Sequence, residues 1–429
     1  MIFNERMETM SRKERAELQL GRLLNIVRRV YARVPFYRAK FKAMKLTPED
    51  IRGLDDLRRL PFTTKEDLRD HYPFGFFACD RDEVARLHGS SGTRGKPTLV
   101  GYTKKDLENW AEVCARAICM CGGRAGDLFH NAYGYGLFTG GLGMHAGAEA
   151  MGAVVVPVSG GQTRRQVTLL ADLRPHGLAC TPSYALNLAE EMERMGHDPS
   201  KSSLRYGIFG AEPWSEAMRT TLERTWNIQA LDVYGLSEVM GPGVSSECAK
   251  AQNGLHIADD HFLAEVIDPL TGDPLPYGQE GELVITTLTK EAFPVIRYRT
   301  GDIASLHREP CKCGRTTLRM SRIKGRIDDM LIIRGVNVFP SEVEAVLLQM
   351  PELAPHYQLL LTRKGALDHV EVQVEIADRQ TSSADMDKKV ADLLKQSLGI
   401  AIHVRVHPPN TIPRSEGKAV RIVDQRGTP

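Results

Sequence analysis

Between residues 104 and 234 the chain alternates short apolar runs with longer segments of helical periodicity, and this alternation constrains the fold more than any other feature. Strands that alternate with helices of this length form a largely parallel sheet covered by helices on both faces. We expect the run at 154–158 to be a short buried strand. The sequence therefore predicts an α/β fold with strands at 127–132, 154–158, 178–181, 206–210 and 230–234, and helices at 104–120, 183–195 and 215–226.

Three further regions surround this alternating core. Apolar positions at helical spacing predict a helical lead-in over residues 1–75, and hairpin-like strands predict a small β unit at about 255–308. Beyond a polar segment at 324–329, a new order of strands and helices predicts a separate α+β unit of about 100 residues. We therefore expect a large N-terminal domain over 1–325, of mainly parallel sheets covered by helices, and a small α+β domain over 326–429.

Composition excludes several classes of protein. The net charge is only +2, so no overall field favours binding to nucleic acid or to a membrane surface. The N-terminus lacks an apolar signal-peptide core, and nowhere do about 18 apolar residues follow one another, as a membrane span requires. We expect a cytoplasmic enzyme. Eight cysteines in such a chain favour metal binding or buried free thiols over disulfides.

A loop rich in serine, threonine and glycine spans residues 88–98 and contains one lysine. Its glycines leave backbone N–H groups free to converge on an anion, and its hydroxyls and Lys96 add donors. The spacing differs from a Walker A loop, because Ser90 stands in place of the first glycine and Pro97 in place of the magnesium-binding hydroxyl. We expect the loop to join two strands and to bind phosphate; the alternative is a surface hairpin without a ligand.

Several segments of the chain resemble known motifs. Four of them, followed by a lysine near the C-terminus, resemble the adenylate-forming superfamily in order and spacing: 90–96, 234–238, 298–302 and 325–329. Within that superfamily the chain resembles the phenylacetate-CoA ligase family, over nearly its whole length, through 132–141, 159–163, 332–340 and 413–418. One departure is Arg94, where a threonine is usual; it adds charge to the phosphate loop.

The resemblance implies an AMP-forming ligase with two half-reactions. A carboxylate attacks the α-phosphorus of ATP to give an acyl adenylate and pyrophosphate, and the thiol of coenzyme A then displaces AMP. The implied partners are ATP, Mg²⁺, coenzyme A and an aromatic monocarboxylic acid such as phenylacetate, and the implied assembly is a homodimer. Two alternatives stay open: an enzyme that loads an aryl acid onto the phosphopantetheine of a carrier protein, and a non-catalytic, zinc-containing nucleotide-binding protein.

The resemblance also assigns roles to single residues. Lys418 is expected to contact the carboxylate and the α-phosphate, Lys96 to hold the outer phosphates, and Glu238 to bind Mg²⁺. Asp302 is suited to accept the ribose hydroxyls. Each of these residues alone also has a plain structural interpretation, such as a turn residue or a helix-terminal acid. The expected nucleotide-binding set is Ser90, Ser91, Gly92, Thr93, Gly95, Lys96, Gly210, Ala211, Glu212, Pro213, Asp232, Tyr234, Gly235, Ser237, Asp302 and Arg326.

A glycine-rich aromatic segment is expected to form the acid pocket, because aromatic walls over a glycine floor leave a flat slot. The alternative is a packed aromatic core without a ligand. The resemblance further implies a mobile small domain, which swings about a hinge near Asp328 and brings Gly335 to coenzyme A. The expected pocket residues are Tyr133, Tyr135, Gly136, Phe138, Gly140 and Gly141.

Four further residues match the ligand types of a structural zinc site. Cys311 and Cys313 flank one residue, and Cys248 and His256 supply two more ligands, enough for tetrahedral Zn²⁺. His261 competes with His256 for the fourth position. The alternative is a set of free thiol and imidazole groups. Because four protein ligands leave no open position, we expect no catalytic role for this metal.

Overall fold

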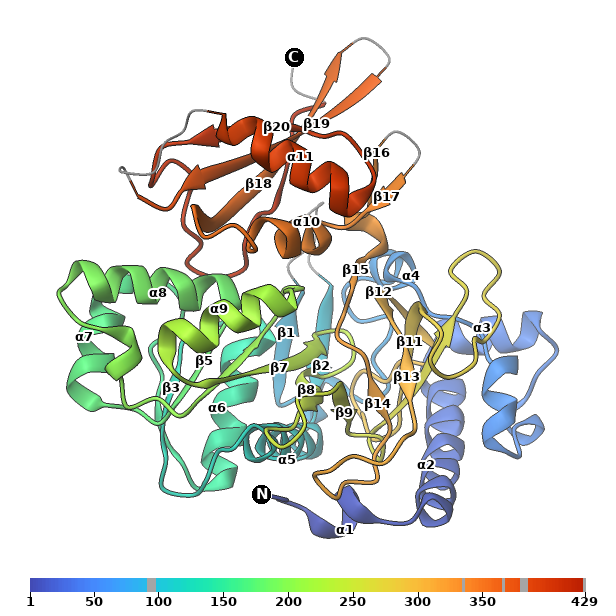
Figure 1. The fold of residues 1–429 in the computed structure, drawn as a ribbon. Helices are drawn as coiled ribbons and strands as arrows, with labels where there is room; N and C mark the ends of the chain where they lie inside the picture. Colours follow the sequence, from blue (N-terminus) through green and yellow to red (C-terminus); the bar gives the residue numbers. More distant parts are fainter. Residues whose placement is uncertain (91–97, 334–335, 365–366, 379–384, 427–429) are drawn as a thin grey trace.

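The computed structural model describes residues 1–90, 98–333, 336–364, 367–378 and 385–426. A large domain carries a smaller C-terminal domain (orange to red) on one end, above helices α8 and α9 (Figure 1). The α/β architecture expected from the sequence is confirmed.

The centre of the large domain is a nine-stranded sheet in the order β13-β14-β9-β8-β7-β6-β5-β3-β4. Its parallel half matches the predicted strands. One difference concerns burial: Val154 is 60% exposed, because its strand forms the edge of the sheet, so the expectation of a buried strand was wrong there. The parallel strands are β3 (Leu128–Asn131), β4 (Val154–Val156), β5 (Gly177–Cys180), β6 (Tyr206–Gly210) and β7 (Gln229–Leu236).

The other half of this sheet is antiparallel, which the sequence did not reveal. Residues 255–257 and 306–307, expected in the small β unit, pair within this sheet instead, because the first of them returns as a hairpin beside β8. The antiparallel strands are β8 (Gly241–Glu247), β9 (Leu255–Ile257), β13 (Leu306–His307) and β14 (Arg319–Met320).

Helices cover both faces of the sheet. Along β6, Phe209 packs into the core with Trp226 of α9, whereas its neighbour Ile208 packs into the core with Met144 of α6. This alternation follows from the two-residue period of a strand. The covering helices are α5 (Lys104–Met120), α6 (Thr139–Met151), α7 (Thr163–Leu173), α8 (Pro182–Arg194) and α9 (Glu216–Trp226).

The N-terminal helices and a four-stranded sheet share a second core region. A capping box between Ser11 and Glu14 starts α2, and Pro35 opens the next helix. The helices are α1 (Glu5–Thr9), α2 (Arg12–Arg33), α3 (Pro35–Ala43) and α4 (Lys65–Asp70); the sheet holds β10 (Phe262–Ile267), β11 (Gly281–Thr287), β12 (Tyr298–Ala304) and β15 (Gly325–Arg326), and β1 (Arg86–Gly89) pairs with β2 (Leu99–Tyr102).

The small domain has its own hydrophobic core around Val343, Val372 and Leu394. Its sheet has the order β20-β19-β18-β21, in which both outer strands run parallel to their neighbours. Its elements are β16 (Leu331–Ile333), β17 (Val336–Val338), α10 (Pro340–Leu347), β18 (Leu353–Lys364), β19 (Leu367–Ile376), α11 (Met386–Leu398), β20 (His403–His407) and β21 (Ile422–Asp424).

Candidate active site

The serine- and glycine-rich loop joins two antiparallel strands, β1 and β2, as the sequence predicted. At its base the Ser90 N–H donates to the Thr98 carbonyl at 3.0 Å. The side-chain oxygens of Ser90 and Thr98 are buried without a hydrogen-bond partner among the described residues. Buried hydroxyls usually have partners, so these two are available to a ligand. The remaining candidates of this loop lie outside the described residues: Ser91, Gly92, Thr93, Gly95 and Lys96, together with Arg94.

The expected acid-pocket segment packs against β1, the strand that precedes this loop. The Gly89 N–H donates to the Leu137 carbonyl at 2.8 Å, which ties β1 to residues 133–141. Within the segment, the Asn131 amide donates to the Tyr135 hydroxyl (2.7 Å) and to the Gly141 carbonyl (2.8 Å).

Tyr133 is buried, whereas Phe138 is 50% exposed. Gly141 allows a close backbone approach, because a Cβ there would lie 2.5 Å from the Gly134 oxygen. At Gly140, by contrast, a Cβ would meet Tyr133 only at an ordinary 3.5 Å, and Gly136 has a φ of +120°, which favours glycine. The segment therefore combines a buried ring, Tyr133, an exposed ring, Phe138, and one tightly packed glycine, Gly141.

Three of the predicted nucleotide-binding residues meet at one carboxylate. The Tyr234 hydroxyl donates to Asp302 Oδ2 at 2.7 Å, and Arg326 Nη1 donates to Oδ1 at 3.1 Å. Burial raises the pKa of the Asp302 carboxyl, and the charges of Arg326 and Lys418 oppose that rise. Arg326 also bonds Asp328, the expected hinge residue, whose side chain is 67% exposed.

The turn between β7 and β8 carries the expected magnesium ligand. Glu238 is only 6% exposed. Next to it, Ser237 Oγ lies 3.1 Å from the Thr139 hydroxyl at the start of α6. Gly235 is required by packing, since a Cβ there would lie 1.8 Å from the Gly241 oxygen. The structure therefore brings this turn against α6, the helix that begins within the expected acid-pocket segment.

Two other predicted residues have protein partners that the sequence did not suggest. Asp232, which lies in β7, pairs with Arg322 at 3.3 Å. Glu212 accepts hydrogen bonds from the Ser183 N–H (2.9 Å) and from the Ala419 N–H (2.7 Å). Glu212 thereby links the start of α8 to the small domain. It follows Gly210, the last residue of β6, and Ala211, whose φ is +69°; Pro213 completes this segment.

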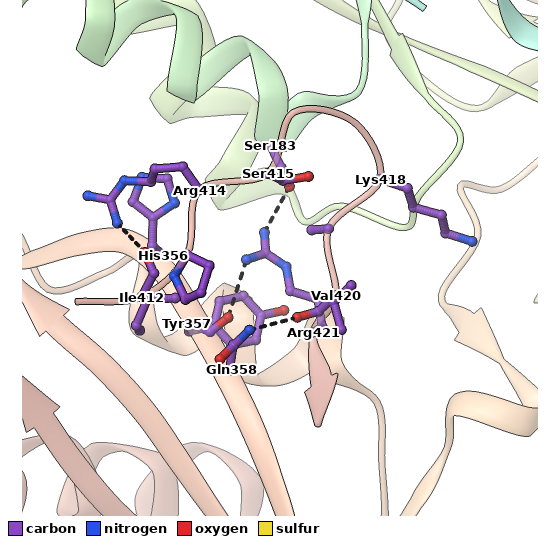
Figure 2. A pocket seen from close by; sticks show the side chains of 12 residues that line it. Ser183, His356, Tyr357, Gln358, Ile412, Arg414, Ser415, Lys418, Val420 and Arg421 are labelled. Carbon is purple, nitrogen blue, oxygen red and sulfur yellow. Dashed lines mark hydrogen bonds between the residues drawn. The ribbon is translucent and has the colours of Figure 1, made fainter. Parts of the chain in front are cut away.

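The loop that carries Lys418 docks onto the large domain at the start of α8. The Thr181 hydroxyl donates to the Gly417 carbonyl (2.7 Å), and the Asn187 amide donates to the Ser415 carbonyl (3.0 Å). A cavity of about 110 Å³ lies beside this loop, and the exposed Lys418 side chain extends away from the arginines that line it (Figure 2). Lys418 also opposes the burial-raised pKa of the Asp329 carboxyl.

Charged contacts across the domain boundary hold this arrangement. Glu190 of α8 accepts from His356 and from Arg414 (2.8 Å), both of the small domain. Glu344 of α10 accepts from the Ser215 N–H (2.9 Å) and pairs with Arg421 (3.2 Å). No short-range sequence signal marked these residues, because each partner lies more than 70 residues away.

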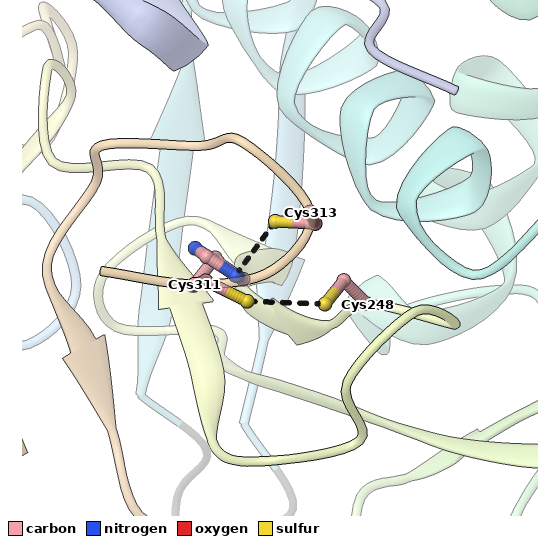
Figure 3. A group of neighbouring side chains, drawn as sticks. Cys248, Cys311 and Cys313 are labelled. Carbon is pink, nitrogen blue, oxygen red and sulfur yellow. Dashed lines mark hydrogen bonds between the residues drawn. The ribbon is translucent and has the colours of Figure 1, made fainter. Parts of the chain in front are cut away.

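The four predicted metal-ligating residues come together on the antiparallel half of the large sheet. The ligand atoms of Cys248, His256, Cys311 and Cys313 all lie within 4.8 Å of one another. The three cysteine sulfurs converge from two segments, one that carries Cys248 and one that carries Cys311 and Cys313 (Figure 3). His256 Nδ1 lies 2.8 Å from the Thr317 hydroxyl, which leaves Nε2 facing Cys313 at 3.4 Å. His261 instead lies beside Glu112 and Asp260, outside the cluster.

In the part of the chain that the structure describes, every helix is too short or too polar to cross a bilayer.

Two known protein families match this chain, one over each of its two domains. The model of the AMP-binding enzyme family matches residues 25–289, and that of the AMP-binding enzyme C-terminal domain matches residues 335–426. The phenylacetate-coenzyme A ligase of Thermus thermophilus is 52% identical over 444 residues, covering 99% of this chain and 100% of the relative. That of Escherichia coli is 51% identical, covering 99% of each chain.

Two solved structures of a 2-hydroxyisobutyryl-CoA ligase, in different states of its reaction, match this chain to different degrees. In the postadenylation state with 2-HIB-AMP, that protein matches with a TM-score of 0.94 at 31% identity, covering 99% of this chain and 92% of the other. In the thioesterification state with coenzyme A, the TM-score is 0.74 at 32% identity, covering 98% and 92%. The two domains of this chain therefore sit as in the postadenylation structure. The full-length identity to curated relatives and the match to both domain models confirm the resemblance seen in the sequence: this chain belongs to the phenylacetate-CoA ligase family of AMP-binding enzymes.

Proposed function

We propose that this chain is an AMP-forming phenylacetate-CoA ligase. The observation that carries this assignment is identity of 50–53%, over 98–99% of the chain, to four curated phenylacetate-coenzyme A ligases. The network around Asp302 supports it, since it presents a buried carboxylate of the kind that binds ribose hydroxyls.

In the first half-reaction, a carboxylate oxygen of phenylacetate attacks the α-phosphorus of ATP, and the bond to pyrophosphate breaks. This step depends mainly on positioning and on charge stabilisation. We assign Lys418 to the carboxylate and the α-phosphate, and the loop with Lys96 to the β- and γ-phosphates. The unpartnered hydroxyls of Ser90 and Thr98 fit a phosphate-binding role. Glu238 would hold Mg²⁺, which neutralises phosphate charge when bound.

The nucleotide sugar is assigned to the Asp302 network. Tyr234 and Arg326 each occupy one oxygen of this carboxylate, and an ionised carboxylate offers about four lone-pair sites. Enough acceptor capacity remains for two ribose hydroxyls. The two donors also fix the plane of the carboxylate before the nucleotide arrives.

The acid is assigned to residues 133–141. Tyr133 and Tyr135 would line the ring of the acid, and the open space beside Gly134 and Gly136 would let it approach the backbone. The exposed ring of Phe138 would cover the bound acid. Because the Leu137 carbonyl bonds β1, this pocket and the phosphate loop would move as one unit.

In the second half-reaction, the sulfur of coenzyme A attacks the acyl carbon of the adenylate, the thiol proton is lost, and AMP leaves. We propose that the small domain, residues 326–429, swings about Asp328 between the two steps and brings Gly335, outside the described residues, to coenzyme A. The exposure of Asp328 and the postadenylation-like arrangement support this division of labour.

We also propose a structural Zn²⁺ at Cys248, His256, Cys311 and Cys313. Three thiols and one imidazole are a common tetrahedral ligand set, and the Thr317 hydroxyl would orient the His256 ring. A homodimer, implied by the family, is checked by light scattering on the purified protein.

The test of the function is exchange of labelled pyrophosphate into ATP, together with AMP release on addition of coenzyme A. We expect exchange that requires phenylacetate, and thioester formation with free coenzyme A. Lys418→Ala should abolish exchange while ATP binding persists, whereas Lys395→Ala, at an exposed lysine of α11, should leave both unchanged. Wild-type protein that fails to exchange with any aromatic acid refutes the assignment.

A further inference from the structure

Lys290 is the largest charged side chain buried completely in the described part of the protein. Its Nζ makes no hydrogen bond to any described residue. It lies over an aromatic ring, with Nζ 3.1 Å from the ring centroid of Tyr102. A buried ammonium without a hydrogen bond costs stability, because it loses its hydration and gains no equivalent partner.

The Tyr102 ring lies between Lys290 and an indole. Trp110 of α5 stacks on it at 4.9 Å between centroids, with an interplanar angle of 17°. Since one face of Tyr102 is covered by the indole, the ammonium lies over the other face. A cation over the face of a desolvated tyrosine ring is attracted by the ring's negative face, which holds the ring in place.

This ring stack holds the turn that carries Glu238. The Tyr102 hydroxyl donates to the Met240 carbonyl at 2.7 Å, and the Trp110 indole N–H donates to the Pro242 carbonyl at 3.1 Å. Both acceptors lie within four residues of Glu238. The backbone of this turn therefore takes its position from the stacked rings.

The same stack contacts the acid-pocket segment. The His88 ring packs edge-on against Tyr102 (5.4 Å) and Trp110 (5.5 Å). His88 Nδ1 lies 3.0 Å from the carbonyl of Leu137. The indole also sets the packing of Gly143 in α6, where a Cβ would lie 2.4 Å from Trp110.

We propose that Lys290 is a positioning residue for adenylation: its ammonium fixes the Tyr102 ring, which sets the place of the Glu238 turn. This inference rests on the proposed function, in which Glu238 binds Mg²⁺. It explains why the chain buries an ammonium where an apolar side chain of equal length would pack at lower cost.

Two features of the surroundings bear on this role. Burial lowers the pKa of Lys290 to about 7, against the charge of Asp106, so the ammonium that contacts the ring is the main form below that pH. The Asp106 carboxylate accepts the N–H groups of Glu291 (2.6 Å) and Ala292 (2.9 Å), which anchors the Lys290 segment to the start of α5. The lysine is therefore held at its backbone, and its side chain is directed at the ring.

The central test compares Lys290→Met with Lys105→Met, the same change at an exposed lysine of α5. Three quantities are measured: the melting temperature, the affinity for Mn²⁺ by electron paramagnetic resonance with a non-hydrolysable ATP analogue, and the Mg²⁺ dependence of pyrophosphate exchange. Lys290→Met should melt at or above the wild-type temperature, bind Mn²⁺ about tenfold more weakly and need correspondingly more Mg²⁺. Lys105→Met should match the wild type in all three.

A second variant tests the route through the ring. Tyr102→Phe keeps the ring and removes the hydroxyl that bonds Met240, so it should weaken Mn²⁺ binding in the same direction. The double variant should be no weaker than the worse single variant, since both changes interrupt one path. Wild-type Mn²⁺ affinity in Lys290→Met, or effects that multiply in the double variant, overturn the inference. Absence of exchange in the wild type refutes the proposed function instead, so the two failures are distinct.

Discussion

Replacing Glu190 with glutamine tests whether the charged contacts across the domain boundary set the balance between the two half-reactions. In the observed arrangement the Glu190 carboxylate bonds His356 and Arg414 of the small domain, and its side chain is 23% exposed. Burial raises the pKa of Glu190, but the bonds to these two partners lower the pKa by more. The pKa therefore lies below its ordinary value, and the carboxylate is charged at neutral pH. Glutamine keeps the shape and removes the charge.

The size of the effect follows from the loss of one charge that takes part in two contacts. A hydrogen bond to a charged group contributes about 1.5–3 kcal/mol, against about 0.5–1.5 kcal/mol for a neutral one. Two contacts would then lose about 2 kcal/mol, and partial exposure reduces this to about 1–2 kcal/mol. Arg414 keeps its pairing with Glu375. The equilibrium between the domain arrangements should therefore shift about 5- to 30-fold away from the observed, postadenylation-like arrangement.

The assay measures each half-reaction alone: pyrophosphate exchange for adenylation, and single-turnover thioester formation from preformed phenylacetyl adenylate. We expect Glu190→Gln to lower the ratio of the first rate to the second at least fivefold. Glu191→Gln is the matched control, because Glu191 pairs only with Arg194 of its own helix among its described ion pairs. An unchanged ratio in Glu190→Gln, or an equal change in both variants, would refute the idea that these contacts govern the swing.

Three further predictions concern the metal cluster, the acid pocket and pH. The purified protein should contain one zinc ion per chain, and Cys313→Ser should lower both the zinc content and the melting temperature; metal-free wild-type protein with an unchanged melting temperature would contradict the site. Gly141→Ala should raise the KM for phenylacetate at least tenfold, because the new Cβ would lie 2.5 Å from the Gly134 oxygen, whereas Gly140→Ala should have a small effect. The pKa of Lys290 is about 7 in the folded protein and near 10.5 in the unfolded chain. Between these pH values the unfolded chain binds one more proton than the folded protein, so the free energy of unfolding should rise with pH by up to about 1.4 kcal/mol per pH unit. Denaturant titrations between pH 7 and 9 should show this pH dependence in the wild type and not in Lys290→Met. The other titratable groups near the ammonium are Asp106, Tyr102 and His88. Equal pH dependence in the two proteins would contradict the assignment.

The sequence predicted the elements with strong local signals. Helix 104–120 was predicted with its observed bounds, because Thr103 and Asp106 form a capping box ahead of an apolar face. The parallel strands were predictable for the same reason, since each apolar run lies between helices. The antiparallel strands β9, β13 and β14 are two or three residues long, and their partners lie far away in sequence, so no local period marks them.

The candidate site was predictable only as separate motifs. Tyr234, Asp302 and Arg326 were each selected by type and position, and the fold brings them to one carboxylate. By contrast, Glu212 and Asp232 have protein partners that only the tertiary structure reveals. Lys290 gave no sequence signal, because a lysine between Thr289 and Glu291 suggests an exposed turn.

The ring stack explains why motifs so distant in sequence act together. Its rings, His88, Tyr102 and Trp110, come from β1, β2 and α5, and Lys290 reaches it from the segment after β11. Through His88 and Tyr102 they contact the base of the phosphate loop, the acid-pocket segment and the Glu238 turn. A shift in any ring would therefore displace the proposed phosphate, acid and metal ligands together, whereas the Lys418 loop, held by contacts at α8, would leave with the small domain in the proposed swing. Changes in the stack should consequently impair adenylation, and changes in the boundary contacts should alter the balance between the two half-reactions.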